Sequence, residues 1–121
     1  MRLYYFEKLD VWQLGRNLIK NVYQLSKKLP NDERFGMISQ MRRAGISINC
    51  NLAEGGSRTS GKEQARFTEI AFGSLMELLN LLITAVDLEY LPQEDIDSIT
   101  PLINDIGNKL TRHRESQLRK S

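Results

Sequence analysis

Apolar residues recur every three or four positions along most of this 121-residue chain, which is the spacing of one face of an α-helix. No stretch alternates with period two for long, and no Asn-Gly or Asp-Gly pair joins two β-branched runs. The pattern therefore predicts four amphipathic helices and no strands, with the helices near residues 8–29, 33–54, 61–90 and 93–118.

Prolines mark two places where the helical pattern should change. Pro30 ends the first helix, because the residue before a proline is pushed out of the α region, and Asn31 or Asp32 can cap the second helix. Pro101 lies inside the fourth helix, where a proline removes a backbone hydrogen bond and clashes with the preceding turn. We therefore expect a kink at Pro101, or a restart of the helix with Thr100 as its cap.

Glycines and an excess of apolar residues characterise the second and third helices. Gly45 lies on the apolar stripe of the second helix, where it lets a neighbouring helix come close. Gly55 and Gly56 follow the last periodic residue, at the place where a left-handed C-cap favours glycine. The third helix is apolar on more than one side, so it needs more than one covering surface, and another copy of the chain could supply the second.

Four helices of about 20 residues joined by short loops predict an all-α fold, an antiparallel up-down four-helix bundle. No linker, repeat or low-complexity tract divides the sequence. We therefore expect one domain over residues 1–121.

The segment GGSRTSGKE, residues 55–63, nearly matches the phosphate-binding pattern G-x-x-x-x-G-K-[ST]. A P-loop needs a strand that delivers its turn to a helix N-terminus, whereas a helix precedes this segment, and Glu63 replaces the magnesium-binding hydroxyl. Ser60 and Glu63 instead fit the S-x-x-E pattern of a capping box. We interpret the segment as a junction between two helices and expect no nucleotide or other cofactor.

The composition offers few groups for catalysis. The net charge is +2, and the chain has one cysteine, Cys50, and one histidine, His113. A zinc site needs several such ligands, and a nucleophile triad lacks a suitable histidine because His113 lies among arginines. The carboxylates of the third helix also lack the repeated E-x-x-H pattern of di-iron bundles. We therefore expect a protein that is not an enzyme.

The sequence also carries no targeting signal that we recognise. No run approaches about 20 apolar residues, which a membrane-spanning helix needs, and the N-terminal MRLYYFEKLD lacks the apolar region of a signal peptide. The single Cys50 suits a reducing compartment. These features predict a cytoplasmic protein without a membrane partner.

Four runs together resemble the four-helix-bundle family of the 23S rRNA intervening-sequence proteins. They are QMRRAGISINCNLAEG at residues 40–55, RFTEIAFGSLMEL at 66–78, FEKLDVW at 6–12 and LPNDERFG at 29–36. The resemblance covers about residues 6–91, so Pro101 and the basic C-terminal tail lie outside it.

This resemblance implies a small bacterial protein whose relatives form ring-like homopentamers. Some members are encoded inside intervening sequences of large-subunit rRNA genes, and a related accessory protein of diversity-generating retroelements assists a reverse transcriptase and binds nucleic acid. The family brings no catalytic residues that could be carried over. The partners that it implies are further copies of the chain, and RNA, DNA or a reverse transcriptase-like protein.

Arg42 and Arg43 lie in the middle of the second helix and have two interpretations. They could line a phosphate-binding surface, or they could pair with Glu54, Glu69 or Glu77 within the chain or between subunits. We favour pairing, because Glu77 falls in the apolar part of the third helix and needs a partner there.

The basic residues at the C-terminus are the candidate nucleic-acid-binding residues: Lys109, Arg112, Arg114, Arg119 and Lys120.

Arg16, Lys20 and Lys27 share a face of the first helix, which we interpret as a solvated face. We interpret Asn49 and Asn51 as packing and hydrogen-bonding residues, and Trp12 as a core or subunit contact rather than a platform for bases.

Three hypotheses for function remain. The first is a homo-oligomeric helical scaffold that binds RNA, DNA or a nucleic-acid enzyme. Nucleic-acid affinity that falls steeply with rising salt would support it. The second is an assembly or adaptor protein with protein partners alone. The third, a hydrolase or nuclease, is disfavoured by the missing metal ligands.

Overall fold

The computed structural model describes residues 4–120, and within them the chain consists of helices and the turns that join them, without a strand. The four long helices are α1 (Asp10–Ser26), α2 (Met37–Gly55), α3 (Gly61–Asp87) and α4 (Gln93–Leu118). Two short 3-10 helices, η1 (Tyr5–Lys8) and η2 (Asn31–Glu33), precede α1 and α2. The prediction of an all-α domain with four helices is confirmed.

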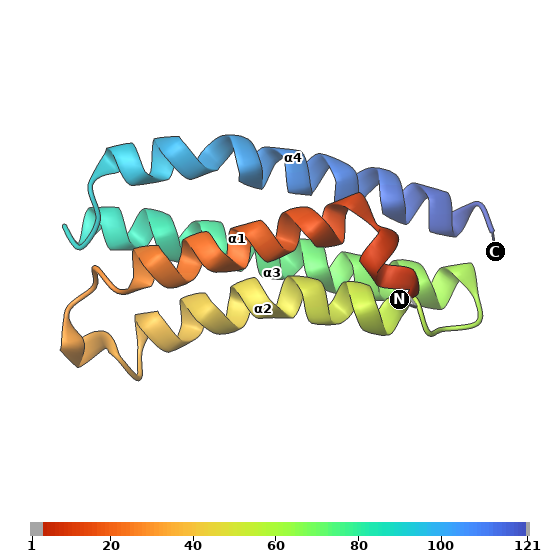
Figure 1. Cartoon of the computed structure of the whole chain (residues 1–121), viewed down its shortest axis with the longest axis horizontal. Helices are drawn as coiled ribbons and strands as arrows, with labels where there is room; N and C mark the ends of the chain where they lie inside the picture. The colour runs from red at the N-terminus through yellow and green to blue at the C-terminus, as the bar shows by residue number, and fades with distance from the viewer. Residues whose placement is uncertain (1–3, 121) are drawn as a thin grey trace.

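The connections between the helices lie at the two ends of an elongated molecule (Figure 1). The α1–α2 and α3–α4 connections lie at one end, which we call the loop end. The α2–α3 turn, η1 and the C-terminal end of α4 gather at the other, which we call the terminal end. Segments that are far apart in the sequence therefore meet at the terminal end.

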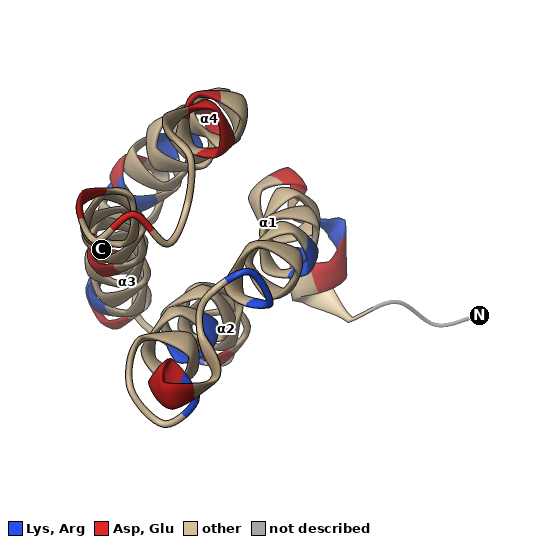
Figure 2. Ribbon diagram, turned by 90° about the vertical axis from the view of Figure 1, so that its left-hand side faces the viewer, with Lys and Arg blue, Asp and Glu red and all other residues tan. Residues whose placement is uncertain are grey.

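One apolar core runs between the four helices. α2 packs most extensively on α3 and α3 on α4, whereas α1 and α4 share the smallest contact, as the end-on view in Figure 2 also shows. Every long helix contributes side chains that are fully buried: Leu18 and Val22 from α1, Met41, Ile48 and Leu52 from α2, Leu75, Leu78 and Leu82 from α3, and Ile103, Ile106 and Leu110 from α4. This is the stripe that the apolar spacing predicts.

The boundary between α1 and α2 differs from the prediction. α1 ends at Ser26, and the N–H of Leu29 then donates to the Ser26 carbonyl over 3.2 Å in the tighter spacing of a 3-10 turn. α2 begins only after Gly36, and no side chain of Asn31 or Asp32 caps it. The Glu33 carboxylate accepts from the Met37 N–H at 3.3 Å instead, so the predicted caps are wrong.

Pro101 does not divide the fourth helix. α4 is continuous from Gln93 to Leu118 with Pro101 inside it, so the predicted restart capped by Thr100 is wrong. The Thr100 hydroxyl donates to the Ile96 carbonyl at 2.7 Å, one turn back. Pro101 is exposed, and the buried residues Ile99 and Ile103 on either side hold the helix against the core.

The glycines at the end of α2 serve close packing rather than a left-handed turn. Among the described glycines none has a positive φ, and Gly56 at the C-cap has φ −63°, so the predicted left-handed cap is wrong. A Cβ on Gly55 would lie 2.9 Å from the Phe67 Cβ, and one on Gly56 would lie 2.6 Å from the Tyr5 ring. Glycine is needed here because neighbouring side chains occupy the space.

The start of α3 agrees with the capping interpretation. Ser60 is the N-cap, and its hydroxyl oxygen accepts from the Glu63 N–H at 3.1 Å. The same hydroxyl lies 3.2 Å from the Glu63 carboxylate, to which it donates. The segment that resembles a P-loop therefore joins two helices, and Ser60 starts the second of them.

By length and composition α3 could cross a membrane, which the sequence pattern did not predict. In the protein, 39% of its apolar window is buried, and the helix packs against α2 and α4. A core helix of a soluble bundle passes the same test, so this feature assigns no membrane to the chain.

Candidate nucleic-acid interface

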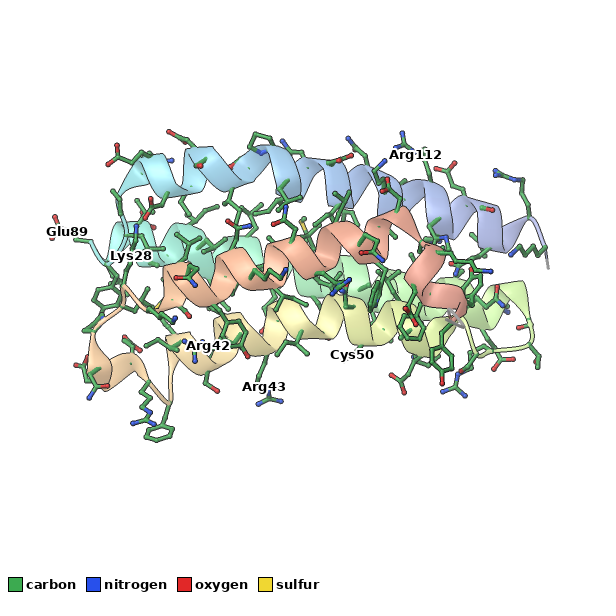
Figure 3. The ribbon with its side chains drawn as sticks, viewed as in Figure 1. Lys28, Arg42, Arg43, Cys50, Glu89 and Arg112 are labelled. Carbon is green, nitrogen blue, oxygen red and sulfur yellow. The ribbon has the colours of Figure 1, made fainter. Side chains whose placement is uncertain are left out.

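The candidate basic residues lie in the last third of α4 and directly after it, and they divide between two faces of the helix. Lys109, Arg112, Arg119 and Lys120 follow each other at helical spacings and share one face, whereas Arg114 points toward α3, as its contact with Glu69 shows. Arg112 lies on the outer side of α4 in Figure 3. Four of the five candidate residues thus share one face of the helix, and Arg114 lies on another.

Two of these basic residues are already ion-paired. The Lys109 Nζ lies 3.0 Å from the Asp10 carboxylate of α1 and 3.8 Å from that of Asp105. The Arg114 Nε lies 2.6 Å from the Glu69 carboxylate of α3. Within residues 4–120 no carboxylate lies at ion-pair distance from the other three, Arg112, Arg119 and Lys120. Of the five candidate residues, these three exposed side chains are the ones with charge left for a polyanion.

A buried polar network fixes the end of α4 that carries them. The Thr68 hydroxyl of α3 donates to the Gln117 Oε1 at 2.6 Å, and Gln117 is 2% exposed. The Gln117 Nε2 lies 3.0 Å from the His113 Nε2. Since the amide nitrogen donates, the imidazole nitrogen must accept, which requires a neutral ring. Burial, and then the positive charge of Lys120, lower the pKa of His113 and favour that neutral form.

Arg42 and Arg43 have different surroundings. The Arg42 Nε donates to the buried Ser26 hydroxyl at 2.9 Å, and its guanidinium lies 4.4 Å from the centre of the Tyr23 ring. Arg43 extends away from the bundle (Figure 3). Arg42 therefore binds α1 within the chain through its Nε, and it also lines a hollow of about 340 Å³ with Arg34, Phe35 and Arg43.

Arg43 and Glu77 both line a hollow of about 320 Å³ between α2 and α3, together with Gln40, Ala44 and Ser47. Across this seam the Ser74 hydroxyl donates to the Ser47 hydroxyl at 2.9 Å. No ion pair joins Arg43 to Glu77 among the described residues. Pairing of Glu77 with an arginine of another subunit stays a prediction.

The third helix leaves an apolar stripe uncovered, as its composition predicts. Phe72, Met76 and Ile83 are 37%, 40% and 47% exposed and lie on one face of α3. Phe72, Met76 and the partly buried Leu79 line a hollow of about 330 Å³ against α4, where Gly107 keeps the seam open. We call this surface the α3 stripe.

Sequence reasoning missed an aromatic surface at the terminal end. Tyr4 and Tyr5 are 64% and 48% exposed, and the Arg58 guanidinium of the α2–α3 turn lies 4.7 Å from the centre of the Phe67 ring. The adjacent tyrosines are visible in the sequence, but their contact with the α2–α3 turn is tertiary.

Within residues 4–120 no three His, Cys, Asp or Glu side chains gather in a way that could hold a metal ion. Lys62, the lysine of the P-loop-like segment, is exposed in the first turn of α3. A helix precedes this segment where a nucleotide-binding loop needs a strand.

Four helices around one core, without a metal cluster among the described residues, define a small all-α helical protein. Over residues 7–112 the sequence matches the model of the 23S rRNA-intervening sequence protein family, and the chain belongs to that family. The family resemblance carried by the four sequence runs is thus confirmed.

A solved structure supports the same fold. The chain is similar to a protein of unknown function from the S23 ribosomal protein family of Bacteroides thetaiotaomicron, whose crystal structure was determined at 1.70 Å. The two share 26% sequence identity and a TM-score of 0.74, over 83% of this chain and 94% of that chain. A search of curated proteins returned no match.

Proposed function

We propose that this protein is a non-enzymatic scaffold, an antiparallel up-down four-helix bundle whose copies assemble into a ring-like homopentamer. The assembly engages RNA, DNA or a nucleic-acid enzyme such as a reverse transcriptase-like protein through its basic surfaces. It acts in the cytoplasm, without a membrane partner and without a cofactor.

The observation that carries the proposal is the α3 stripe. A monomer rarely leaves several large apolar side chains exposed along one helix face, and such a surface is typical of a protein contact. The stripe borders a hollow that a side chain of a second copy could fill. When the stripe of one copy contacts a different surface of the next copy, the contact is heterologous. Repeated heterologous contacts form a closed ring if the rotation between neighbouring copies divides a full turn evenly.

Assembly also strengthens the weak charge of the single chain. The net charge of +2 per chain becomes about +10 for five copies, and clustered charge attracts a polyanion more strongly than scattered charge. Arg112, Arg119 and Lys120 would then repeat around the ring axis.

The assembly is tested by sedimentation of the wild type and of the variant Met76→Glu/Ile83→Glu at micromolar concentration. The wild type should sediment as an oligomer, most simply a pentamer, and the variant as a 13.9 kDa monomer. The matched control is Ile70→Glu/Leu88→Glu, which places the same two charges on exposed apolar residues outside the stripe. A monomeric wild type, or a control that dissociates equally, would remove the scaffold proposal.

Nucleic-acid binding is tested with a labelled RNA or DNA at about 50 mM salt. Replacing Arg112, Arg119 and Lys120 together by Ala should weaken binding severalfold and make it less salt-dependent. Arg114→Ala should have a smaller effect, because Glu69 already neutralises that charge. The control replaces Lys20, Lys27 and Arg34 by Ala, which removes the same charge elsewhere.

The alternative function is a protein-only assembly or adaptor module. The α3 stripe favours it as well, because an apolar contact requires no nucleic acid. Two outcomes would favour this alternative. The wild type could form an oligomer but bind no nucleic acid at low salt, or the triple variant of Arg112, Arg119 and Lys120 could weaken binding no more than its control.

A further inference from the structure

The terminal end brings an exposed tyrosine onto the α2–α3 turn. The Tyr5 ring lies so close to Gly56 that a Cβ on this glycine would be 2.6 Å from the ring. Despite this contact the Tyr5 side chain is 48% exposed. Gly56 has φ −63°, a backbone conformation that any residue can adopt. Glycine is therefore needed at this position because the Tyr5 ring leaves no room for a side chain. The turn thus supports an aromatic ring whose surface remains in solvent.

Further aromatic residues continue this surface. Tyr4 is 64% exposed, and its ring is parallel to that of Phe6 with the centroids 6.1 Å apart. Phe6 packs edge-on against Trp12 at 5.0 Å, and Trp12 in turn packs on the core. Tyr4 is therefore held by a series of ring contacts, so that both tyrosines have a fixed support and an exposed side.

Basic side chains lie at the same end of the molecule as the two tyrosines. Arg58 belongs to the same turn as Gly56, and its guanidinium lies over Phe67. The terminal end also carries the end of α4 (Figure 1), and the exposed Arg119 and Lys120 directly follow its last residue, Leu118. Arg112 lies earlier in α4 and lines a hollow with Leu9 and Val11, just after η1. Aromatic rings interleaved with positive charge are the combination that binds unpaired nucleotides, since the rings stack on bases and the cations meet the phosphates.

The loop end carries another exposed aromatic residue beside arginines, but this end as a whole is acidic. Phe35 is 91% exposed, and the Arg34 guanidinium lies 5.6 Å from its ring centre. The chemical pair is similar to that of the terminal end, and Arg42 and Arg43 line the same hollow as Phe35. Over the loop end as a whole, acidic residues outnumber the basic Lys27, Lys28 and Arg34: they are Asp32, Glu33, Asp87, Glu89, Glu94, Asp95 and Asp97. Figure 2 looks along the bundle at this end, where acidic segments lie at the start of α4. The loop end as a whole is therefore less attractive to a polyanion than the terminal end.

We propose that the terminal end is a binding site for single-stranded nucleic acid, in which Tyr4 and Tyr5 stack on unpaired bases while Arg58 and the basic residues of α4 bind the phosphates. The inference rests on the proposed nucleic-acid function and specifies its ligand. Bases in a duplex are already stacked on each other and present only their edges, so the tyrosines select single strands. No group of the site reads a ribose hydroxyl, and RNA and DNA strands should bind alike.

The test is fluorescence anisotropy with a mixed-sequence RNA strand of about 16 nucleotides, the DNA strand of the same sequence, and the RNA duplex. The variants are Tyr4→Leu/Tyr5→Leu, which keeps apolar side chains without rings, and Gly56→Ala, which displaces the Tyr5 ring without removing it. Phe35→Leu is the matched control. Helix content and oligomeric state are measured for every variant.

The wild type should bind either single strand about tenfold more tightly than the duplex, and the double tyrosine variant should lose about tenfold for the strands alone. Gly56→Ala should lose affinity in the same direction with its helix content unchanged, and Phe35→Leu should bind like the wild type. Equal weakening for strands and duplex, an equal effect of Phe35→Leu, or loss of the oligomer in the tyrosine variant would overturn the site. A wild type that binds neither strand nor duplex would instead remove the nucleic-acid function itself, and the site with it.

Discussion

Gly15 has no room for a side chain, because Asn49 of the neighbouring helix occupies that space. A Cβ on Gly15 would lie 1.9 Å from the Asn49 Oδ1. The Asn49 Nδ2 donates to the Trp12 carbonyl at 3.1 Å, and the residue is 8% exposed. The amide thus joins α1 to α2 beside Gly15.

We expect Gly15→Ala to destabilise the fold by about 1–3 kcal/mol, because the new methyl group must displace the buried amide. Gly45→Ala is the matched control, since its Cβ would meet only Val22 atoms at 3.8 Å, an ordinary contact. Gly45→Ala should be neutral or stabilise by up to about 1 kcal/mol through helix propensity. Urea unfolding of both variants measures the difference, and equal effects would contradict the packing argument.

These residues show what local patterns can and cannot reveal. The interpretation of Asn49 as a packing and hydrogen-bonding residue is confirmed, because a polar residue on an apolar stripe needs a buried partner. The importance of Gly15 was missed, and Gly45 was given the role instead. Both glycines lie on apolar stripes, and only the spatial neighbour decides which one a methyl group would disturb.

At the scale of elements, the end of α4 depends on a neutral His113. Its pKa is lowered by burial and by Lys120, whereas in the unfolded chain it returns to about 6.5. The unfolded state therefore binds the proton first as the pH falls. The stability that this residue contributes is complete above about pH 6.5 and is lost as the pH falls from there toward the lower folded-state value.

We expect the wild type to lose more stability between about pH 7 and about pH 5 than the variant His113→Gln, which cannot titrate. Glutamine can still accept a hydrogen bond from Gln117, so the variant keeps the contact. Urea unfolding across this pH range gives the comparison. Parallel pH profiles for the two proteins would show that His113 does not couple the α4 end to pH.

Helix interiors were predictable, and their ends were less so. The spacing of apolar residues reflects burial along a whole helix, and all four helices appear where it places them. The end of α1 and the start of α2 depend instead on a few backbone hydrogen bonds and on the Glu33 carboxylate. Pro101 was overestimated because the packing of α4 on the core compensates one lost hydrogen bond.

At the scale of the whole molecule, the basic stripe of α4 was predictable and its partners were not. Spacing along one helix places Arg112, Arg119 and Lys120 together. The pairing of Lys109 with Asp10 and of Arg114 with Glu69 joins residues from different helices. The contact between Tyr5 and the α2–α3 turn likewise joins segments that are distant in the sequence, so it depends on the tertiary fold.

The separation of charge between the two ends gives the molecule an electric polarity along its length. A polyanion that approaches from any side experiences a torque, which turns the terminal end toward it before contact. In a closed ring the subunits are related by rotation about the ring axis, so only the components of these polarities along that axis add. In a ring whose bundles run parallel to the axis, the polarities therefore add instead of cancelling. Such a ring would have one electropositive and one electronegative face, and at low ionic strength successive rings would attract each other face to back into columns that salt disperses.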